Sequence, residues 1–438
     1  MMTNFRISEI SGENAMTLFV PFLLCILLAG CADRHETNRS ENRTGNDINI
    51  DVEHVLLAEL GNERKKNAAY RLTADGEERI VSWGYRILEW PVESGARTNE
   101  VVPEVEGLWY SNGGTVMDVN GNGNEELIVA RDVVAGYARE DDFEYEGDLE
   151  HVELLWYESV PGSTTWEGHH IAIIEENSPH DIHSFVTQTS DGEARGVVIS
   201  TGRQKLIWFE IPDDPASAWK RHDLITLPEY GHSGLTIGDI SGDGLPDILT
   251  GMFWIESPSD PINGTWRAHR FGTWDYNDYE VNWGGMAKHL LSDFDGDGKK
   301  DLIVTEAEIE NGRMSFFKQN PDDTYGLWNE EIIDTTLYAP HSLVSTDFND
   351  NGYHDVIVGE MTAGGWGFPL QDNPKIYVFW NNGDGTFFKD TLIEGWGVHE
   401  MGLVTRPDGT KLLYAADEIQ PHKFEEMETH VSYWLLKP

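Results

Sequence analysis

Four acidic, glycine-rich loops along the chain each lead directly into a short apolar segment. The most regular loop, residues 293–301, reads DFDGDGKKD and is followed by Leu302-Ile303-Val304. The others cover residues 239–247 (DISGDGLPD), 347–355 (DFNDNGYHD) and 118–126 (DVNGNGNEE). A polar turn followed by Ile, Leu and Val is typical of a hairpin that enters a buried β-strand. The loops that begin at residues 239, 293 and 347 are 54 residues apart. A fixed period of about 50 residues with short strands indicates a repeat architecture.

Shorter turns complete the repeat. Asp-Gly pairs at residues 75–76, 191–192 and 408–409 precede further apolar segments and predict hairpins that need no metal. Together with the four loops they define seven units. A third strand rich in aromatic residues follows most hairpins, and three units continue into a Trp-x-x-His pair, which we interpret as packing on an outer strand. Seven units of four antiparallel strands predict an all-β fold, a seven-bladed β-propeller. Residues 48–56 would supply the strand that the last unit lacks and so close the ring.

The loops also have the chemistry of a site for a hard cation. Oxygen side chains alternate along each loop, and Ca²⁺ takes six to eight oxygen ligands from side chains and backbone carbonyls. Residue twelve of the most regular loop is Val304, whereas an EF-hand has a glutamate there. About three calcium sites are expected, with the loop at 118–126 a weaker fourth; the alternative is a set of plain acidic turns. The predicted ligands, in which the seventh residue of a loop contributes its carbonyl, are Asp293, Asp295, Asp297, Lys299, Asp301, Asp239, Ser241, Asp243, Leu245, Asp247, Asp347, Asn349, Asn351, Tyr353, Asp355, Asp118, Asn120, Asn122, Asn124 and Glu126.

Composition narrows the choice of partners. The chain has 438 residues and a formal net charge of -46, which argues against a nucleic-acid partner because a polyanion would be repelled. Its two cysteines, Cys25 and Cys31, both precede the repeats, so the repeat region contains no disulfide. Cation-binding loops would stabilise the repeat region in place of disulfides.

We expect the protein to be a monomer.

The N-terminus has the features of an export signal. Residues 18–28 form an apolar run that is too short to span a bilayer and suits a signal-peptide core. The run ends in Leu28-Ala29-Gly30-Cys31, which resembles the bacterial lipobox, so Cys31 is the expected lipidation site; a plain secretory signal is the alternative. Translation starts at Met1 or Met16. We therefore divide the chain into a signal peptide (1–31), a polar, disordered tether (32–46) and the propeller (47–438). This predicts a cell-envelope lipoprotein, periplasmic or surface-exposed, that meets the membrane only through its lipid.

The loop pattern with its following Ile/Leu/Val strand resembles the FG-GAP and VCBS repeat family, which includes the heads of integrin alpha subunits. The resemblance covers residues 47–438, with three well-formed loops and four degenerate units. It implies the propeller fold and Ca²⁺ in the loops. It does not fix a function, because members range from adhesion heads to carbohydrate-active enzymes.

Histidines recur where the first strand of a unit begins, at the mouth of the expected central channel. They are His183, His232, His341 and His399. Converging imidazoles suit a transition metal or acid–base chemistry, whereas the simpler alternative is that each histidine caps its own strand. Arg131 and Arg203 follow second strands and are expected on the same face, where they would neutralise a ligand's charge. Longer insertions at 131–153, 272–283 and 362–375 are also expected there, and their aromatic residues suit a sugar ligand.

Three functions remain open at this point. The first is a propeller that binds a glycan or a surface or extracellular protein partner through its histidine- and aromatic-lined face, since no catalytic signature stands out. The second is a carbohydrate-active enzyme of the polysaccharide lyase or sugar dehydratase type, which would use the channel-mouth histidines with a tyrosine such as Tyr85, Tyr230 or Tyr276. The third is a structural scaffold.

Overall fold

The computed structural model describes residues 50–61, 68–92, 97–138, 146–201, 204–228, 233–274, 287–364, 369–417 and 429–437. The predicted signal peptide with Cys31 and the predicted tether lie outside these residues, as do His232 and Arg203, so they stay predictions. No helix in the described ranges is long and apolar enough to cross a membrane.

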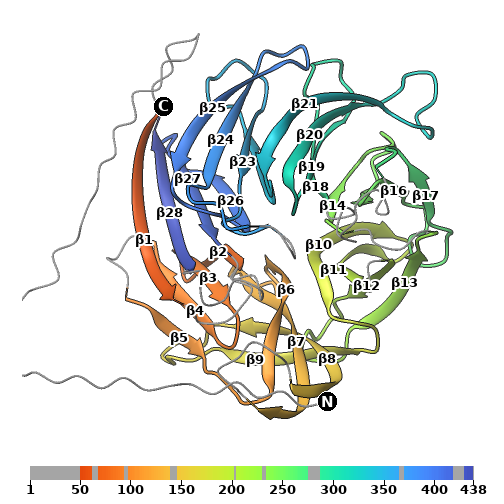
Figure 1. Cartoon of the computed structure of the whole chain (residues 1–438). Coiled ribbons are helices and arrows are strands. Elements are labelled where there is room, and N and C mark those ends of the chain that lie inside the picture. The colour runs from red at the N-terminus through yellow and green to blue at the C-terminus, as the bar shows by residue number, and fades with distance from the viewer. Residues whose placement is uncertain are drawn as a thin grey trace, which may run out of the picture. The chain divides into compact units, whose positions relative to one another are not determined.

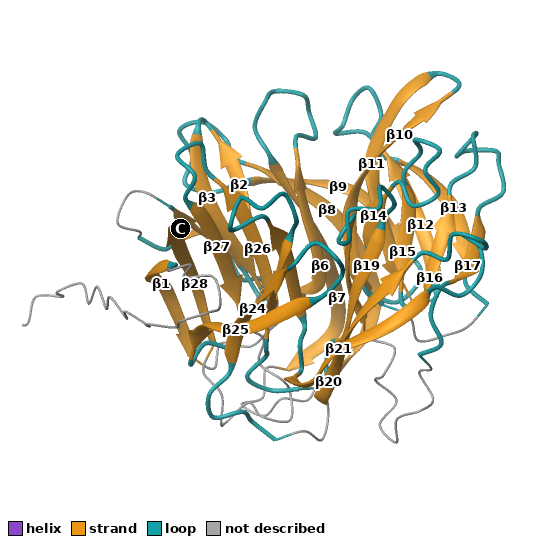
Figure 2. Ribbon diagram, turned by 90° about the horizontal axis from the view of Figure 1, so that it is seen from above, coloured by secondary structure: helices purple, strands orange, loops and turns teal. Residues whose placement is uncertain are grey.

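The described residues form strands β1 to β28, arranged as seven four-stranded antiparallel sheets, and contain no helix. Each sheet is one blade (Figure 1, Figure 2). Blades one to three comprise β2 (Ala68–Ala74), β3 (Glu77–Trp83), β4 (Ile87–Pro91), β5 (Asn99–Val102), β6 (Leu108–Met117), β7 (Glu126–Ala138), β8 (Glu146–Glu158), β9 (Glu167–Ile174), β10 (Pro179–Thr189), β11 (Gly192–Thr201), β12 (Lys205–Glu210) and β13 (Lys220–Thr226). Blades four to six comprise β14 (Thr236–Gly238), β15 (Asp247–Thr250), β16 (Phe253–Glu256), β17 (Arg267–Arg270), β18 (Ala287–Ser292), β19 (Asp301–Glu306), β20 (Glu310–Lys318), β21 (Asn329–Tyr338), β22 (Ser342–Thr346), β23 (Asp355–Gly359), β24 (Lys375–Asn381) and β25 (Phe387–Glu394). Blade seven comprises β26 (Glu400–Thr405), β27 (Lys411–Ala416), β28 (Thr429–Lys437) and β1 (Asp51–Gly61).

The blades close into a ring around a central axis. The first strand of each blade is innermost, and each innermost strand contacts the next, from β2 through β6, β10, β14, β18 and β22 to β26 and back to β2 (Figure 1). Closure comes from β1, which pairs with β28 from Asp51 opposite Lys437 to Gly61 opposite Thr429. The prediction of a seven-bladed β-propeller closed by the N-terminal strand is confirmed.

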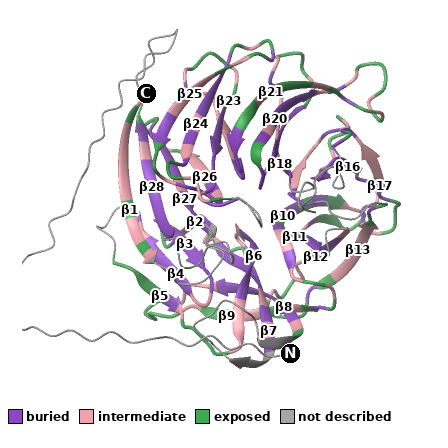
Figure 3. Cartoon of the chain, viewed as in Figure 1, coloured by how far each residue is buried: buried purple, intermediate pink, exposed green. Residues whose placement is uncertain are grey.

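The core lies between neighbouring sheets. Middle strands such as β11, β19 and β23 are buried along most of their length, whereas outer strands such as β13 carry half-buried and exposed residues (Figure 3). Apolar side chains from two adjacent blades form each cluster; Ile128 and Trp156 of blade two, for example, pack with Ile182 and Val197 of blade three. A blade therefore buries its apolar faces only when both neighbours are present.

The histidines of the Trp-x-x-His pairs in blades two to four belong to repeated stacks of three side chains. In each blade the histidine of the fourth strand stacks on a tryptophan of the third strand and forms a short contact with the glutamate that ends that strand. The three stacks are Trp156–His169–Glu158, Trp208–His222–Glu210 and Trp254–His269–Glu256, with ring separations of 4.0, 4.6 and 4.5 Å and His–Glu distances of 2.8, 2.7 and 3.0 Å. These contacts support the interpretation of the pairs as packing.

Side-chain amides also tie each of two blades to the loop of the blade before it. Gln319 Nε2 donates to the carbonyl of Ile240 at 2.9 Å, and Asn381 Nδ2 donates to the carbonyl of Phe294 at 2.8 Å. Because these carbonyls belong to the acidic loops, the conformation of a loop is coupled to the third strand of the following blade.

Acid pH is expected to weaken blade seven through His430 on β28. Its Nε2 donates to the carbonyl of Gly397 at 2.9 Å, and its Nδ1 accepts from Ser432 Oγ at 2.9 Å. Burial lowers the pKa of His430 from 6.5 to about 4. Between these values the unfolded chain binds a proton that the folded protein does not, so stability falls as the pH drops from 6.5 to 4, by up to about 3 kcal/mol.

A urea titration repeated between pH 7.5 and pH 4.5 measures this effect. His430→Gln keeps a side chain of similar size that cannot take up the proton, and it is expected to flatten the decline in the free energy of unfolding. His170→Gln, at an exposed position on β9, serves as the matched control and is expected to retain the wild-type slope. Equal slopes for His430→Gln and the wild type would contradict the prediction.

Candidate functional site

A polar cavity lies on the axis of the ring, where the innermost strands begin. It has a volume of ≈ 210 Å³, and all seven blades contribute to its wall. The acidic loops lie at the other ends of these strands; β14, for example, begins at Thr236 on the cavity wall and runs into the loop at residue 239. Wall residues that carry polar or aromatic side chains include Tyr70, Asp181, His183, Thr236, Lys288, Ser342, Glu400 and Tyr414.

Charged groups in the cavity are paired around Lys288. Its ammonium group lies 2.6 Å from Glu400 Oε1 and 4.0 Å from Asp181 Oδ1. Burial disfavours the charged lysine, but Glu400 and Asp181 together raise the pKa of Lys288 above its ordinary value. Asp181 also bonds to His180 Nδ1 at 2.8 Å and to the backbone N–H of Gly234 at 3.1 Å. Although burial opposes it, His180 and then Lys288 hold the pKa of Asp181 below its usual range. The cavity therefore contains fixed charges of both signs.

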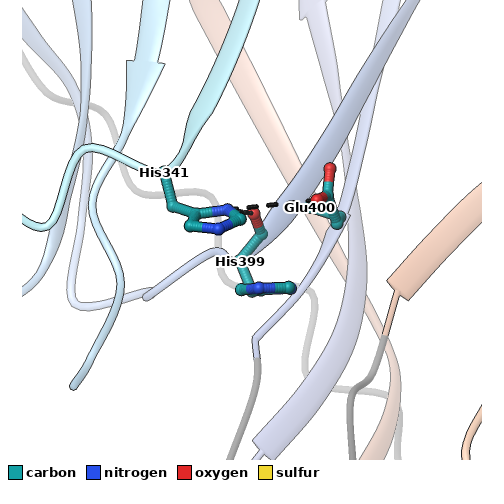
Figure 4. Close-up of side chains that lie close together, drawn as sticks. All are labelled: His341, His399 and Glu400. Atoms are coloured by element: carbon teal, nitrogen blue, oxygen red, sulfur yellow. Dashed lines mark hydrogen bonds and ion pairs between the residues drawn. The ribbon is translucent and has the colours of Figure 1, made fainter. Parts of the chain in front are cut away.

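His341, His399 and Glu400 form a cluster beside this group (Figure 4). His341 and His399 are buried, and their rings stack with centroids 4.0 Å apart. His341 Nδ1 donates to the carbonyl of His399 at 2.8 Å, which leaves Nε2 as the basic atom of the neutral ring. Nε2 is buried and has no hydrogen-bond partner among the described residues; the nearest carboxylate oxygen, on Glu308, lies 3.7 Å away. Burial, and next the nearby His399, lower the pKa of His341 well below its ordinary value.

This cluster has the donor set of a transition-metal site. Its two imidazoles and one carboxylate can each offer a ligand atom, and these atoms lie within 4.8 Å of one another. The orphaned Nε2 of His341 is a further feature that suits a metal ligand, since a buried polar atom without a partner costs free energy.

Of the four predicted histidines, His341 and His399 are brought together, His183 lies on the cavity wall and His232 falls outside the described residues. The His183 side chain is accessible from the cavity, and the cavity wall surrounds it. Burial within this wall lowers the pKa of His183, whereas the charge of Asp181 acts to raise it. His341 makes a contact to the next blade, because its partner carbonyl belongs to blade seven, so it does more than cap its own strand.

The position expected for Arg131 is wrong. β7 continues to Ala138, so Arg131 lies within the second strand of blade two and not after it. It sits opposite Tyr110 and Glu153, and its guanidinium bonds to Glu153 Oε2 at 2.5 Å. The guanidinium of Arg131 is thus already paired with Glu153, and Arg131 is not among the described residues that line the cavity. Most of the insertion expected at 131–153 is accordingly a long β7–β8 hairpin.

Two tyrosines on the cavity wall, Tyr70 of β2 and Tyr414 of β27, escaped the sequence interpretation. Burial raises the pKa of Tyr70 well above its ordinary value, and Glu400 adds to the shift. Tyr230 and Tyr276 fall outside the described residues, and Tyr85 is not part of the cavity wall. The signal that finds Tyr70 is its place in the first strand of blade one, near the start that carries histidines in other blades.

The acidic loops fold around their first and ninth residues. In the loop at 239–247, Asp239 accepts the backbone N–H groups of Gly242 and Gly244 at 2.7 and 3.0 Å. The ninth residue, Asp247, is fully buried and accepts the N–H of Ile240 at 3.0 Å. Asp347 and Asp355 repeat this arrangement in blade six. The first and ninth carboxylates therefore hold the shape of the loop by accepting hydrogen bonds from backbone N–H groups.

The loop at 293–301 contains buried carboxylate oxygens. Asp293, Asp295 and Asp297 can each offer an oxygen atom within 4.8 Å of the others. Gly296 and Gly298, at φ 73° and 86°, provide the left-handed turns that bring them together. Asp293 Oδ1 and Asp301 Oδ1 are buried with no hydrogen-bond partner among the described residues. Burial, and next the charge of Asp295, raise the pKa of Asp301 to about 7. Orphaned, closely spaced carboxylate oxygens fit the needs of a hard divalent cation.

Comparisons with known proteins address the repeat and the fold. The FG-GAP-like repeat family matches residues 293–358, which span the loops of blades five and six. No curated protein matches the chain.

Solved structures resemble the chain only distantly. The intramolecular trans-sialidase from Ruminococcus gnavus, in complex with oseltamivir carboxylate, is 11% identical with a TM-score of 0.40, covering 86% of this chain and 96% of that one. AofleA from Arthrobotrys oligospora is 12% identical with a TM-score of 0.39, covering 83% and 95%. The Photorhabdus luminescens Tc holotoxin pore is 14% identical with a TM-score of 0.35, covering 84% of this chain but 16% of that one. These likenesses are too distant to indicate a ligand. The matched repeat and the seven-bladed ring together fit an FG-GAP/VCBS repeat β-propeller.

Proposed function

We propose that this protein is a calcium-stabilised, envelope-anchored β-propeller that binds a glycan, or a surface or extracellular protein partner, at the mouth of its central cavity. The observation that carries the proposal is the cavity wall. It combines tyrosines, a threonine and a serine with the paired charges of Asp181, Lys288 and Glu400. Sugar hydroxyls both donate and accept hydrogen bonds, and a wall of fixed donors and acceptors next to aromatic rings suits them.

A glycan array followed by calorimetry tests the binding site. His183→Ala removes a side chain that is accessible from the cavity, so the fold is expected to survive while affinity for an array hit falls at least tenfold. His170→Ala, on the outer strand β9, is the matched control and is expected to bind like the wild type. Binding that His183→Ala leaves untouched would place the ligand elsewhere on the molecule. No binding to any glycan or envelope protein would favour the scaffold.

Removing calcium is expected to lower the melting temperature by roughly 5–10 °C, because two or more sites saturated at about a hundred times their dissociation constants each stabilise the fold by about 2.7 kcal/mol. Differential scanning calorimetry with and without a chelator measures the shift, and elemental analysis gives the stoichiometry. Asp239→Asn is expected to reduce the chelator-dependent shift. Asp408→Asn, in a turn without the loop pattern, is the control and is expected to leave it unchanged. A chelator-insensitive wild type would contradict the calcium proposal.

The second candidate function is a carbohydrate-active enzyme, and the cluster of His341, His399 and Glu400 favours it. A lyase acting on a sugar acid removes the proton next to the carboxylate and expels the 4-linked group, leaving an unsaturated sugar. The neutral His341 Nε2 or the Tyr70 hydroxyl would take part as acid and base, and Lys288 would face the carboxylate. A transition metal held by the cluster would supply further charge neutralisation.

Absorbance of an unsaturated product, measured over a panel of acidic and neutral polysaccharides, separates the enzyme from the binding propeller. Turnover that is lost in His341→Ala, together with loss of a stoichiometric Zn²⁺ or similar ion, would establish the enzyme. Binding without turnover or transition metal would favour the binding propeller.

Envelope anchoring rests on the sequence at Cys31. Metabolic labelling with a radioactive fatty acid is expected to mark the wild-type chain and not Cys31→Ser. Export without labelling would favour the plain secretory signal.

A further inference from the structure

We propose that Lys318 is a built-in competitor for calcium at the loop of residues 293–301, and that it makes this loop a weaker calcium site than its counterparts at 239–247 and 347–355. The inference rests on the calcium part of the proposed function. It runs against the simple reading of the sequence, because the loop at 293–301 has the most carboxylates of the four.

Lys318 reaches the loop from the end of the third strand of blade five. Leu302 pairs with Phe317 in the β19–β20 ladder, so Lys318 lies opposite Asp301, the last residue of the loop. Its ammonium group forms an ion pair with Asp295 and lies 3.2 Å from Asp297 Oδ2. Two of the three clustered carboxylates are therefore already engaged by a cation that the chain itself supplies.

The matching position in the other blades is not cationic. The same register places Glu256 opposite Asp247 in blade four and Trp380 opposite Asp355 in blade six. In blade two it places Glu158 opposite Glu126, and Glu158 accepts a hydrogen bond from Asn120 of the loop at 3.1 Å. A glutamate at this position adds a negative oxygen near the loop, whereas a lysine opposes the approach of Ca²⁺.

Lys318 does not replace a divalent cation completely. In blades four and six the second oxygen of the ninth residue accepts a backbone N–H, from Ser257 to Asp247 and from Asn381 to Asp355, both at 2.8 Å. In blade five the corresponding oxygen, Asp301 Oδ1, is fully buried and has no hydrogen-bond partner among the described residues, and Asp293 Oδ1 is in the same state. Calcium binding is therefore still expected at this loop, because the two unpaired oxygens would gain a ligand. The calcium ion must first displace Lys318 from Asp295 and Asp297.

Calorimetric titration with Ca²⁺ tests this competition. The triple variant Asp118→Asn/Asp239→Asn/Asp347→Asn weakens the other three loops and so isolates blade five in the full chain. Adding Lys318→Gln is expected to tighten calcium binding at the remaining site by about tenfold or more, and to lower the melting temperature in chelator, because the internal ion pair is gone. Lys318→Arg, which keeps the charge, is expected to bind calcium no more tightly than the parent. Lys299→Gln removes the same charge from the loop without touching Asp295, and it is expected to change the affinity less than Lys318→Gln.

The results distinguish the two proposals. Unchanged affinity in Lys318→Gln, or equal tightening in Lys299→Gln, would overturn the role of Lys318 while leaving calcium binding in place. Should Lys318→Gln not fold, the Lys318→Arg variant and the parent still bear on the inference, since a parent site as tight as an intact loop at 239–247 would refute it. No calcium binding by the wild type would overturn the calcium proposal itself.

Discussion

Deleting residues 1–61 is expected to abolish the cooperative folding of the propeller. The deletion removes β1, and with it the partner of β28 along the whole length from Thr429 to Lys437. Val55, Leu57, Ala58 and Leu60 pack against the apolar cluster shared by blades one and seven. These side chains are half-buried, so at roughly 1 kcal/mol for each of the three larger ones the loss is about 3 kcal/mol, and the β1–β28 hydrogen bonds that are lost with them bring the cost close to the stability of a typical domain.

The exposed edge of β28 adds a second consequence. An unpaired strand with free N–H and C=O groups is a template for pairing with another chain, so aggregation is expected along with unfolding. Light scattering and urea unfolding followed by tryptophan fluorescence measure both effects. A chain that lacks residues 1–46 keeps β1 and is the matched control, expected to unfold like the intact propeller. A soluble, cooperatively unfolding chain without residues 1–61 would show that six blades and three strands suffice.

Replacing Lys288 by methionine is expected to cost about 3 kcal/mol of stability, because it leaves Asp181 and Glu400 as poorly compensated carboxylates in an enclosed cavity. The two ion-pair contacts, at 2.6 and 4.0 Å, are lost together. The same change is expected to abolish ligand binding at the cavity, since it alters the charge balance of the wall.

A charge-restoring variant separates electrostatics from packing. Lys288→Met/Glu400→Gln removes one positive and one negative charge, and about half of the lost free energy of unfolding is expected to return. Lys205→Met removes two ion pairs, with Glu176 and Asp223, away from the cavity. It is the control and is expected to cost less than about 1 kcal/mol, because these groups are partly exposed. An unfolding midpoint in Lys288→Met equal to that of the wild type would refute the role of Lys288.

The seven blades were predictable because their hairpins carry local signals. In a loop such as residues 239–247, Gly242 and Gly244 predict the turn. The apolar segment that follows predicts a strand without any information about distant residues. Ring closure was predictable for a similar reason, since the last unit ends one strand short and an apolar segment precedes the first.

The cavity was harder to predict because seven separate strands form it. Asp181 and Lys288 are 107 residues apart in sequence, and their contact depends on the rotation of each blade about the axis. Arg131 was misplaced for a different reason. The residues Val133 and Val134 that follow it continue the apolar pattern of β7, and this extension of the strand was read as an insertion.

The position of Lys318 could have been predicted from the register between neighbouring strands, in addition to the hydrophobic pattern. The segment Phe316-Phe317-Lys318 is one of the aromatic-rich third strands of the repeat, and its alignment with β19 fixes where the lysine lies. Counting back along an antiparallel pair from the end of the acidic loop would have placed the lysine opposite Asp301 and next to the carboxylates. The signal was present in the sequence and needed only the rule that neighbouring strands pair residue by residue.

The amide links from Gln319 to the Ile240 carbonyl and from Asn381 to the Phe294 carbonyl have a consequence for how the ring responds to damage. A linear array of repeats can fray from either end, because its terminal units have one neighbour each. A closed array has no terminal units, so the loss of any blade breaks two interfaces at once. The amide links make the acidic loops part of this dependence between neighbours. A change in the loop of blade four or five is expected to weaken a hydrogen bond made by the following blade. Partially unfolded states of the ring are therefore disfavoured. Once one interface between blades is lost, the remaining blades are expected to unfold with it.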